Sequence, residues 1–169
     1  MEAIEAILTR RSIRKYSEKE ISPERIKQLL EAAMQAPSAN NCQPWHFVII
    51  SDKKTLTAIR EFHPGAQMLN EASCAILICG DLKLQSYKTY WAVDCGAATQ
   101  NLLIAAHAIG LGAVWLGVYP RDERMNPIKK LFNLPENIQP FALVSIGYPA
   151  EEKEMVYRYK PERVHYEKW

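Results

Sequence analysis

The stretch Tyr90–Val118, YWAVDCGAATQNLLIAAHAIGLGAVWLGV, holds the longest helical pattern of the chain, followed directly by a strand pattern. Its apolar residues recur at spacings of three and four up to Ile109, as they do on one face of a helix. Gly110 and Gly112 then form a helix-stop signal, and Ala113–Val118 is an apolar run of strand length. The order predicts a long helix that returns directly into a buried strand.

The same alternation of helix and strand continues on both sides of this stretch. Ser22-Pro23 marks a helix start, with Ser as N-cap and Pro at the first helical position, and Pro37 ends that helix. Asp52 is expected to cap the next helix. The other predicted helices cover residues 2–9, 53–62 and 122–132, and the other predicted strands cover 46–50, 75–79 and 142–146. Apolar strands between helices predict a three-layer helix–sheet–helix domain.

The bulk composition predicts one domain over residues 1–169 and excludes several classes of function. With 48% apolar residues and a net charge of +2, the chain is expected to bury a sizeable core and not to bind nucleic acid through bulk charge. No run of about 18 apolar residues indicates a membrane span, and no signal peptide opens the chain, so a cytoplasmic protein is expected. The four cysteines lack zinc-site spacing, so no metal site is predicted, and Cys74 and Cys79 are expected to be buried.

Three cations and a hydroxyl crowd together just after the first predicted helix, in Arg10-Arg11-Ser12-Ile13-Arg14. Arginine presents a planar fork that suits a phosphate group, and serine adds a neutral donor. The alternative is a solvated helix end, where arginine complements the helix dipole. The sequence alone leaves both interpretations open.

Two further segments are candidates for binding. The loop Ala36–Phe47, APSANNCQPWHF, is stiffened by two prolines and rich in amide and hydroxyl groups that can pair with a planar heterocycle. The alternative is a polar turn beside a core Trp45. Gly117, in the predicted strand after Gly112, would let the backbone approach a flat ligand closely.

Taken in order, these motifs resemble the nitroreductase family of flavoproteins. The resemblance is carried by Arg-Arg-Ser-x-Arg-x-Tyr, by Ala-Pro-Ser-x-x-Asn-x-Gln-Pro-Trp-x-Phe, and by Asp94-x-Gly-x-Ala-x-Gln-Asn-Leu-Leu followed by Gly-Leu-Gly-x-x-Trp. It implies an α+β fold, FMN as cofactor, NADH or NADPH as co-substrate, and an intertwined homodimer with active sites at the interface. Residues 150–169, a charged and aromatic tail without periodicity, would wrap the partner subunit.

The resemblance also implies site residues by position. The FMN phosphate and ribityl chain would be held by Arg10, Arg11, Ser12 and Arg14. The isoalloxazine would be contacted from the other subunit by Pro37, Ser38 and Asn41, with Gln43 a weaker candidate. Leu116 and Gly117 would lie near the reactive side of the flavin. A cation of the tail would also reach the phosphate; Arg158 is the first choice, with Lys160 and Arg163 as rivals.

The expected activity follows from the cofactor, because no nucleophile–base pair is visible and no catalytic side chain is therefore named. We expect hydride transfer from NAD(P)H through flavin N5 to a nitroaromatic, a quinone or a related small acceptor, with ping-pong kinetics. Ene reduction or dehalogenation on the same fold is an alternative. So is a flavin-binding or redox-partner module with little turnover. The short segment between the strand at 75–79 and the helix at 90–109 leaves the substrate pocket undefined.

Overall fold

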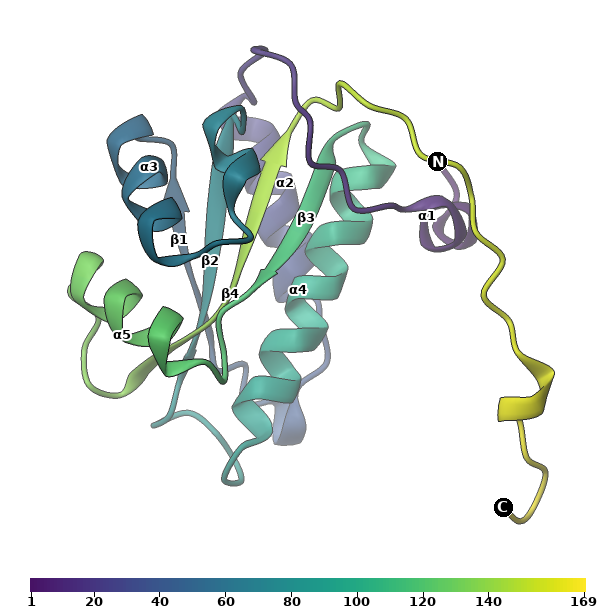
Figure 1. Ribbon diagram of the computed structural model, residues 1–169. Helices are drawn as coiled ribbons and strands as arrows, with labels where there is room; N and C mark the ends of the chain where they lie inside the picture. Colours follow the sequence, from purple (N-terminus) through teal and green to yellow (C-terminus); the bar gives the residue numbers. More distant parts are fainter.

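A four-stranded sheet with helices on both faces makes up most of the computed structural model, which describes residues 1–169 (Figure 1). The strands are β1 (Trp45–Ile50), β2 (Cys74–Asp81), β3 (Gly112–Gly117) and β4 (Ile138–Gly147). They lie in the order β1-β2-β4-β3, and each neighbouring pair is antiparallel. The helices are α1 (Ala3–Thr9), α2 (Pro23–Met34), α3 (Lys53–Phe62), α4 (Tyr90–Ala108) and α5 (Asp122–Leu131).

The sheet separates two hydrophobic cores, which confirms the predicted three layers. Along β2, Leu77 belongs to the core that α3 and α5 cover, whereas Ile76 and Ile78 belong to the core that α2 and α4 cover. Successive side chains of a strand point to opposite faces, so a strand that is apolar at every position must be covered on both. β2 is buried along nearly its whole length for this reason.

The predicted helices and strands are all present, with bounds that differ by a few residues, and the local signals explain most of them. Pro23 occupies the first position of α2, and Ser22 is its N-cap, although the Ser22 side chain makes no capping hydrogen bond. The Asp52 carboxylate accepts the Thr55 N–H at 2.9 Å and caps α3. Gly110, with φ of +79°, ends α4 in the left-handed conformation that glycine adopts at little cost.

β3 lies at an edge of the sheet, and the segment after α1 runs along it. Ser12 forms a parallel bridge with Ala113, and the Ile13 N–H donates to the Ala113 carbonyl at 3.1 Å. A Cβ on Gly112 would lie 2.7 Å from the Ile13 side chain, so this glycine is required for the close packing of the two segments. The arginine cluster is therefore fixed at the outer edge of the sheet.

The last twenty residues run past α1 and then extend away from the rest of the chain (Figure 1). They contain no α-helix or strand, only a short 3₁₀ turn at Pro161–Arg163. Tyr157, Tyr166 and Trp169 are 80%, 84% and 102% exposed, so the apolar area of this tail finds no cover in its own chain.

Two expectations drawn from the composition concern the cysteines and the apolar character of the helices. Cys74 and Cys79 are buried and unpaired, as expected, and burial raises the pKa of Cys74 to about 11 and that of Cys79 to about 12. Their thiols therefore stay protonated and unreactive at neutral pH. None of the helices combines the length and the apolar character needed to cross a bilayer.

Candidate functional site

Three arginines approach one another at the junction of α1 and the tail. Burial lowers the pKa of Arg10, and the charges of Arg11 and Arg158 lower it further, so residues separated by almost the whole chain share one location. No ion pair in the chain includes any of these arginines. Like charges brought together without a carboxylate produce a local excess of positive charge, which an anion such as phosphate would relieve.

Arg11 differs from its neighbours because its guanidinium already has partners. It donates to the carbonyl oxygens of Leu8 and Arg10, and across the chain to those of Glu154 at 3.0 Å and Val156 at 3.5 Å. Arg11 therefore ties the beginning of the tail to α1, and few of its five donors remain for a ligand. The side chains of Arg10 and Arg158 make no hydrogen bond within the chain and keep their donors.

Ser12 and Arg14 are held by their backbones, which leaves their side chains free. The Ser12 carbonyl accepts from Lys153 Nζ at 2.9 Å, and the Arg14 N–H donates to Glu151 Oε1 at 2.6 Å. Glu151 and Lys153 in turn form an ion pair at 3.4 Å. Lysine and glutamate of the tail thus fix the backbone of the cluster, while the hydroxyl and guanidinium remain available to a ligand.

The second predicted segment, residues 37–43, is a tight polar loop with a side-chain network of its own. Ser38 Oγ accepts the Gln43 N–H at 2.9 Å, and Gln43 Nε2 donates to Asn41 Oδ1 at 2.7 Å. Asn40, Asn41 and Gln43 all have positive φ, between 47° and 55°. Such a strained path persists only when its surroundings hold it.

Asp94 of α4 supplies part of that restraint. This carboxylate is 4% exposed, and its Oδ1 accepts the Ala39 N–H at 3.0 Å, while Oδ2 has no partner. A buried carboxylate with an unused oxygen is costly, so its hydrogen bond to the loop is a strong restraint. The sequence contained Asp94 within a recognisable motif but gave no indication that it holds the loop.

The two predicted segments lie at opposite ends of α4. Asp94 holds the loop near the beginning of the helix, whereas His107, near its end, contacts Thr9 Oγ1 at 2.8 Å, directly before the arginine cluster. Thirteen residues of helix at 1.5 Å each separate Asp94 from His107, or about 20 Å. Within one chain, the loop and the arginine cluster are thus separated by about 20 Å.

Leu116 and Gly117 end β3, on the same strand edge as the arginine cluster. From Ala113, where the Ser12 segment joins, to Gly117 is four strand residues, or about 13 Å. The Ala113 carbonyl points away from β4, toward Ile13. Because alternate residues of a strand direct their peptide groups to the same side, Gly117 also presents its backbone to the open edge, whereas Leu116 faces β4.

The packing of the chain itself does not require a glycine at position 117. A Cβ there would meet only Arg124 Nη1, at 3.9 Å, and the φ of this residue is not positive. A Cβ on Gly80 would instead lie 2.4 Å from Trp91, and one on Gly147 would lie 2.7 Å from Tyr16. Gly117 is therefore the strand glycine with open space above it, and the space suits a group from outside the chain.

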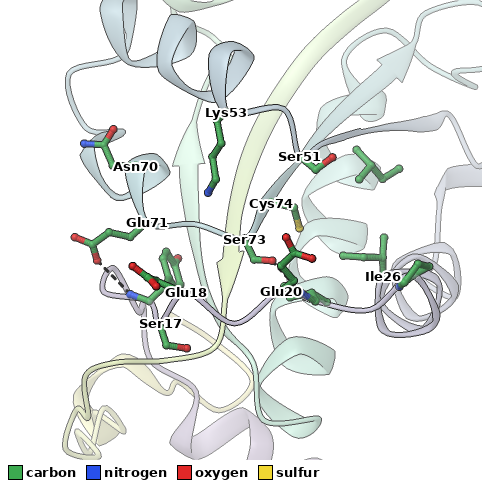
Figure 2. Close-up of a pocket in the computed structure, with 14 residues that line it drawn as sticks. Ser17, Glu18, Glu20, Ile26, Ser51, Lys53, Asn70, Glu71, Ser73 and Cys74 are labelled. Atoms are coloured by element: carbon green, nitrogen blue, oxygen red, sulfur yellow. Dashed lines mark hydrogen bonds between the residues drawn. The ribbon is translucent and has the colours of Figure 1, made fainter.

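A cavity of about 980 Å³ lies elsewhere. It is lined by residues 16–26, by the end of β1 and by residues 70–74, and it includes none of the predicted cofactor residues. Figure 2 shows Glu18, Glu20 and Glu71 around it, with Lys53 as its cation. This excess of carboxylates repels a phosphate, so the cavity is no substitute for the arginine cluster.

Known proteins are similar to this chain over nearly its whole length. The chain matches the family model described as Nitroreductase family over residues 7–73 and 63–148. A protein of Archaeoglobus fulgidus, provisionally named NADH dehydrogenase/NAD(P)H nitroreductase, is 50% identical over 172 residues, which cover 99% of each chain.

Two solved structures show the same fold over the whole chain. One, from Parabacteroides distasonis and with the same provisional name, is 40% identical with a TM-score of 0.95, and the match covers 99% of this chain and 98% of that one. Another, from Desulfovibrio desulfuricans and provisionally named a nitroreductase, was solved in complex with FMN. It is 30% identical with a TM-score of 0.86 and covers 100% of this chain and 98% of its own.

Proposed function

Since this chain belongs to the nitroreductase family, we propose that it is an FMN-dependent oxidoreductase. It passes hydride from NADH or NADPH to a small acceptor, a nitroaromatic, a quinone or a related compound. The observation that carries this proposal is the group formed by Arg10, Arg11 and Arg158, which the fold brings together and none of which forms an ion pair. Such a site calls for a dianionic group such as the FMN phosphate.

The residues of the chain fit FMN at two places. Arg10, Arg14 and Arg158 have guanidinium groups without partners within the chain and would hold the phosphate. Gly117 lies about 13 Å from Ala113 along the same strand edge. It leaves room for the ring and presents an outward-facing N–H to it. When bound, FMN supplies the hydride-transfer chemistry, and the side chains named here bind and orient it.

The remaining contacts come from a second copy of the chain. Pro37, Ser38 and Asn41 are about 20 Å from the arginine cluster along α4, so they serve the site of the partner subunit in this proposal. Gln43 is bonded within the loop and acts there as a support. This arrangement implies a homodimer with two sites at its interface. In such a dimer, the exposed side chains of α1 and of the tail pack against the partner subunit.

The protein needs no catalytic side chain in this scheme. Its residues fix the cofactor, present the Gly117 N–H, and leave one face open for the donor and then for the acceptor. One shared face predicts ping-pong kinetics, in which plots of reciprocal rate against reciprocal substrate concentration are parallel.

The experiment is a bisubstrate assay of the purified, FMN-loaded protein. NADH or NADPH is varied against menadione and, separately, against nitrofurazone. Oxidation of the nucleotide with parallel reciprocal plots supports the proposal. An FMN-loaded protein that neither nucleotide reduces would overturn the oxidoreductase and leave a flavin-binding module.

A further inference from the structure

Three elements meet at the carbonyl oxygen of Gly117. His63, the residue directly after α3, lies with its Nε2 3.0 Å from this oxygen, and Arg124 of α5 donates from Nη1 at 2.6 Å. A carbonyl oxygen can only accept, so His63 Nε2 carries the proton. Both lone pairs of the Gly117 carbonyl are thus used by side chains of two different helical segments.

This arrangement leaves other polar atoms unsatisfied. His63 is 2% exposed, and its Nδ1 has no partner; neither has the buried Nε of Arg124. Buried nitrogen atoms without partners are costly, and most such atoms in folded proteins find one. Apolar side chains at these two positions would avoid that cost, so folding stability alone gives a poor reason for the pair.

The two hydrogen bonds act at a position where the backbone has much conformational freedom. Glycine has the greatest backbone freedom of all residues, and Gly117 ends an edge strand, with its peptide group turned away from β4. The Gly117 N–H belongs to the peptide unit shared with Leu116, whose backbone faces β4, so rotation about the Cα–C bond of Gly117 is the freedom that the sheet leaves. The His63 and Arg124 hydrogen bonds remove that freedom by fixing the Gly117 carbonyl, which belongs to the following peptide unit.

We propose that His63 and Arg124 are positioning residues that hold the Gly117 peptide in the orientation required for the flavin ring. The proposal rests on the proposed function, since it takes the open edge at Gly117 as the ring site. The two side chains touch neither the cofactor nor the substrate; they act through the Gly117 backbone. Their role is to hold the strand end at Gly117 in one backbone conformation, so that the N–H facing the ring stays in place, and so to tune both the affinity for FMN and its reduction potential.

The test compares deletion of each donor with its replacement. His63→Leu and Arg124→Met remove the donors, whereas His63→Gln and Arg124→Lys keep an N–H in a similar place. Arg60→Met is the matched control. Arg60 lies on α3 and donates to the side chains of Asn70 and Gln67, and it too has an unpaired buried Nε, but it makes no hydrogen bond with β3.

Three quantities are measured for each variant: the FMN dissociation constant by fluorescence quenching, the midpoint potential of bound FMN, and the melting temperature of the apoprotein. Losing a donor to Gly117 is expected to weaken FMN binding roughly tenfold and to shift the potential, and the Gln and Lys variants restore most of both. Arg60→Met lowers the melting temperature alone. The carbon-13 shift of the Gly117 carbonyl in the apoprotein reports the loss of each hydrogen bond directly.

The outcomes separate the two claims. If the unmodified protein binds FMN and both His63→Leu and Arg124→Met match its affinity and potential, the positioning role is wrong and the proposed function stands. If the unmodified protein binds no FMN, both fall. Should Arg124→Met fail to fold, the pair His63→Leu and His63→Gln decides the question.

Discussion

Among the cations of the tail, Arg158 is the one whose charge shifts the pKa of Arg10. Lys160 and Arg163, two and five residues further on, do not contribute to that shift. We predict that Arg158→Ala weakens FMN binding by about 1.5–3 kcal/mol, the range for a hydrogen bond to a charged group. Lys160→Ala and Arg163→Ala are the matched controls and should change the dissociation constant little. Equal losses in all three variants would mean that the tail contributes only diffuse charge.

Gly117 allows binding to be separated from stability at a single residue. Because a Cβ at this position has room and the backbone is not left-handed, Gly117→Ala should leave the melting temperature unchanged or raise it slightly. The same methyl group would occupy the space proposed for the flavin, so FMN affinity should fall at least roughly tenfold, as when a tight contact is overpacked by 1–3 kcal/mol.

Gly112→Ala is the complementary variant. Its Cβ would lie 2.7 Å from Ile13, so it should lower the melting temperature and disturb the arginine cluster. If Gly117→Ala bound FMN as tightly as the unmodified protein, the ring would have to lie somewhere else.

At the scale of elements, the packing of α3 and α5 against the end of β3 predicts a pH dependence of stability. Burial, Arg124 and Arg121 lower the pKa of His63, whereas the ordinary value for histidine is 6.5. Below pH 6.5 the unfolded chain therefore binds more protons at this site than the folded chain, and the free energy of unfolding decreases as the pH falls. Above pH 6.5 this contribution to stability is fully present.

Chemical denaturation between pH 5 and pH 8 measures this dependence. Burial and the charges of Arg10 and Arg11 lower the pKa of His107 as well, so two histidines contribute with the same sign. His63→Gln should flatten part of the slope and leave the part due to His107. An unchanged slope in this variant would show that His63 titrates normally.

Local signals were enough to predict the helices and strands, because the bounds of these elements depend on residues close together in the sequence. Asp52 caps α3 through Thr55, Pro23 favours a helix start through its fixed φ, and Gly110 ends α4 by adopting a positive φ. The same signals could not predict the strand order β1-β2-β4-β3, because strand order depends on pairings between segments that are distant in the sequence. The site shows the same division. The sequence named Arg10 and Gly117 as candidates, but it gave no sign of the contacts of His63, 54 residues from Gly117, or of those between Arg11 and the tail.

At the scale of the whole molecule, the tail has two parts with different attachments. Residues 150–156 are bound to the N-terminal segment through Ala150, Glu151, Lys153 and the carbonyls that Arg11 holds. Residues 157–169 make no hydrogen bond to the body of their own chain, and most of their aromatic side chains are exposed. The second part is therefore the one available to a partner subunit.

Two truncations test this division. Deleting residues 157–169 should leave a folded chain that elutes as a monomer and binds FMN weakly, because the deletion removes both Arg158 and the segment that covers the partner. Deleting residues 150–169 should also lower the melting temperature, because the hydrogen bond between Arg14 and Glu151 is lost. A chain shortened at residue 156 that still eluted as a dimer would contradict the role given to the tail.

If two copies of the chain together complete each FMN site, FMN binding must depend on dimer formation, and the number of FMN molecules per oligomer measures this dependence. Apoprotein is titrated with FMN and examined by native mass spectrometry across protein concentrations that span the dimer dissociation. We predict two FMN molecules on each dimer and none on the monomer. FMN bound to the monomer with the affinity of the dimer, or no FMN on either species, would contradict the account.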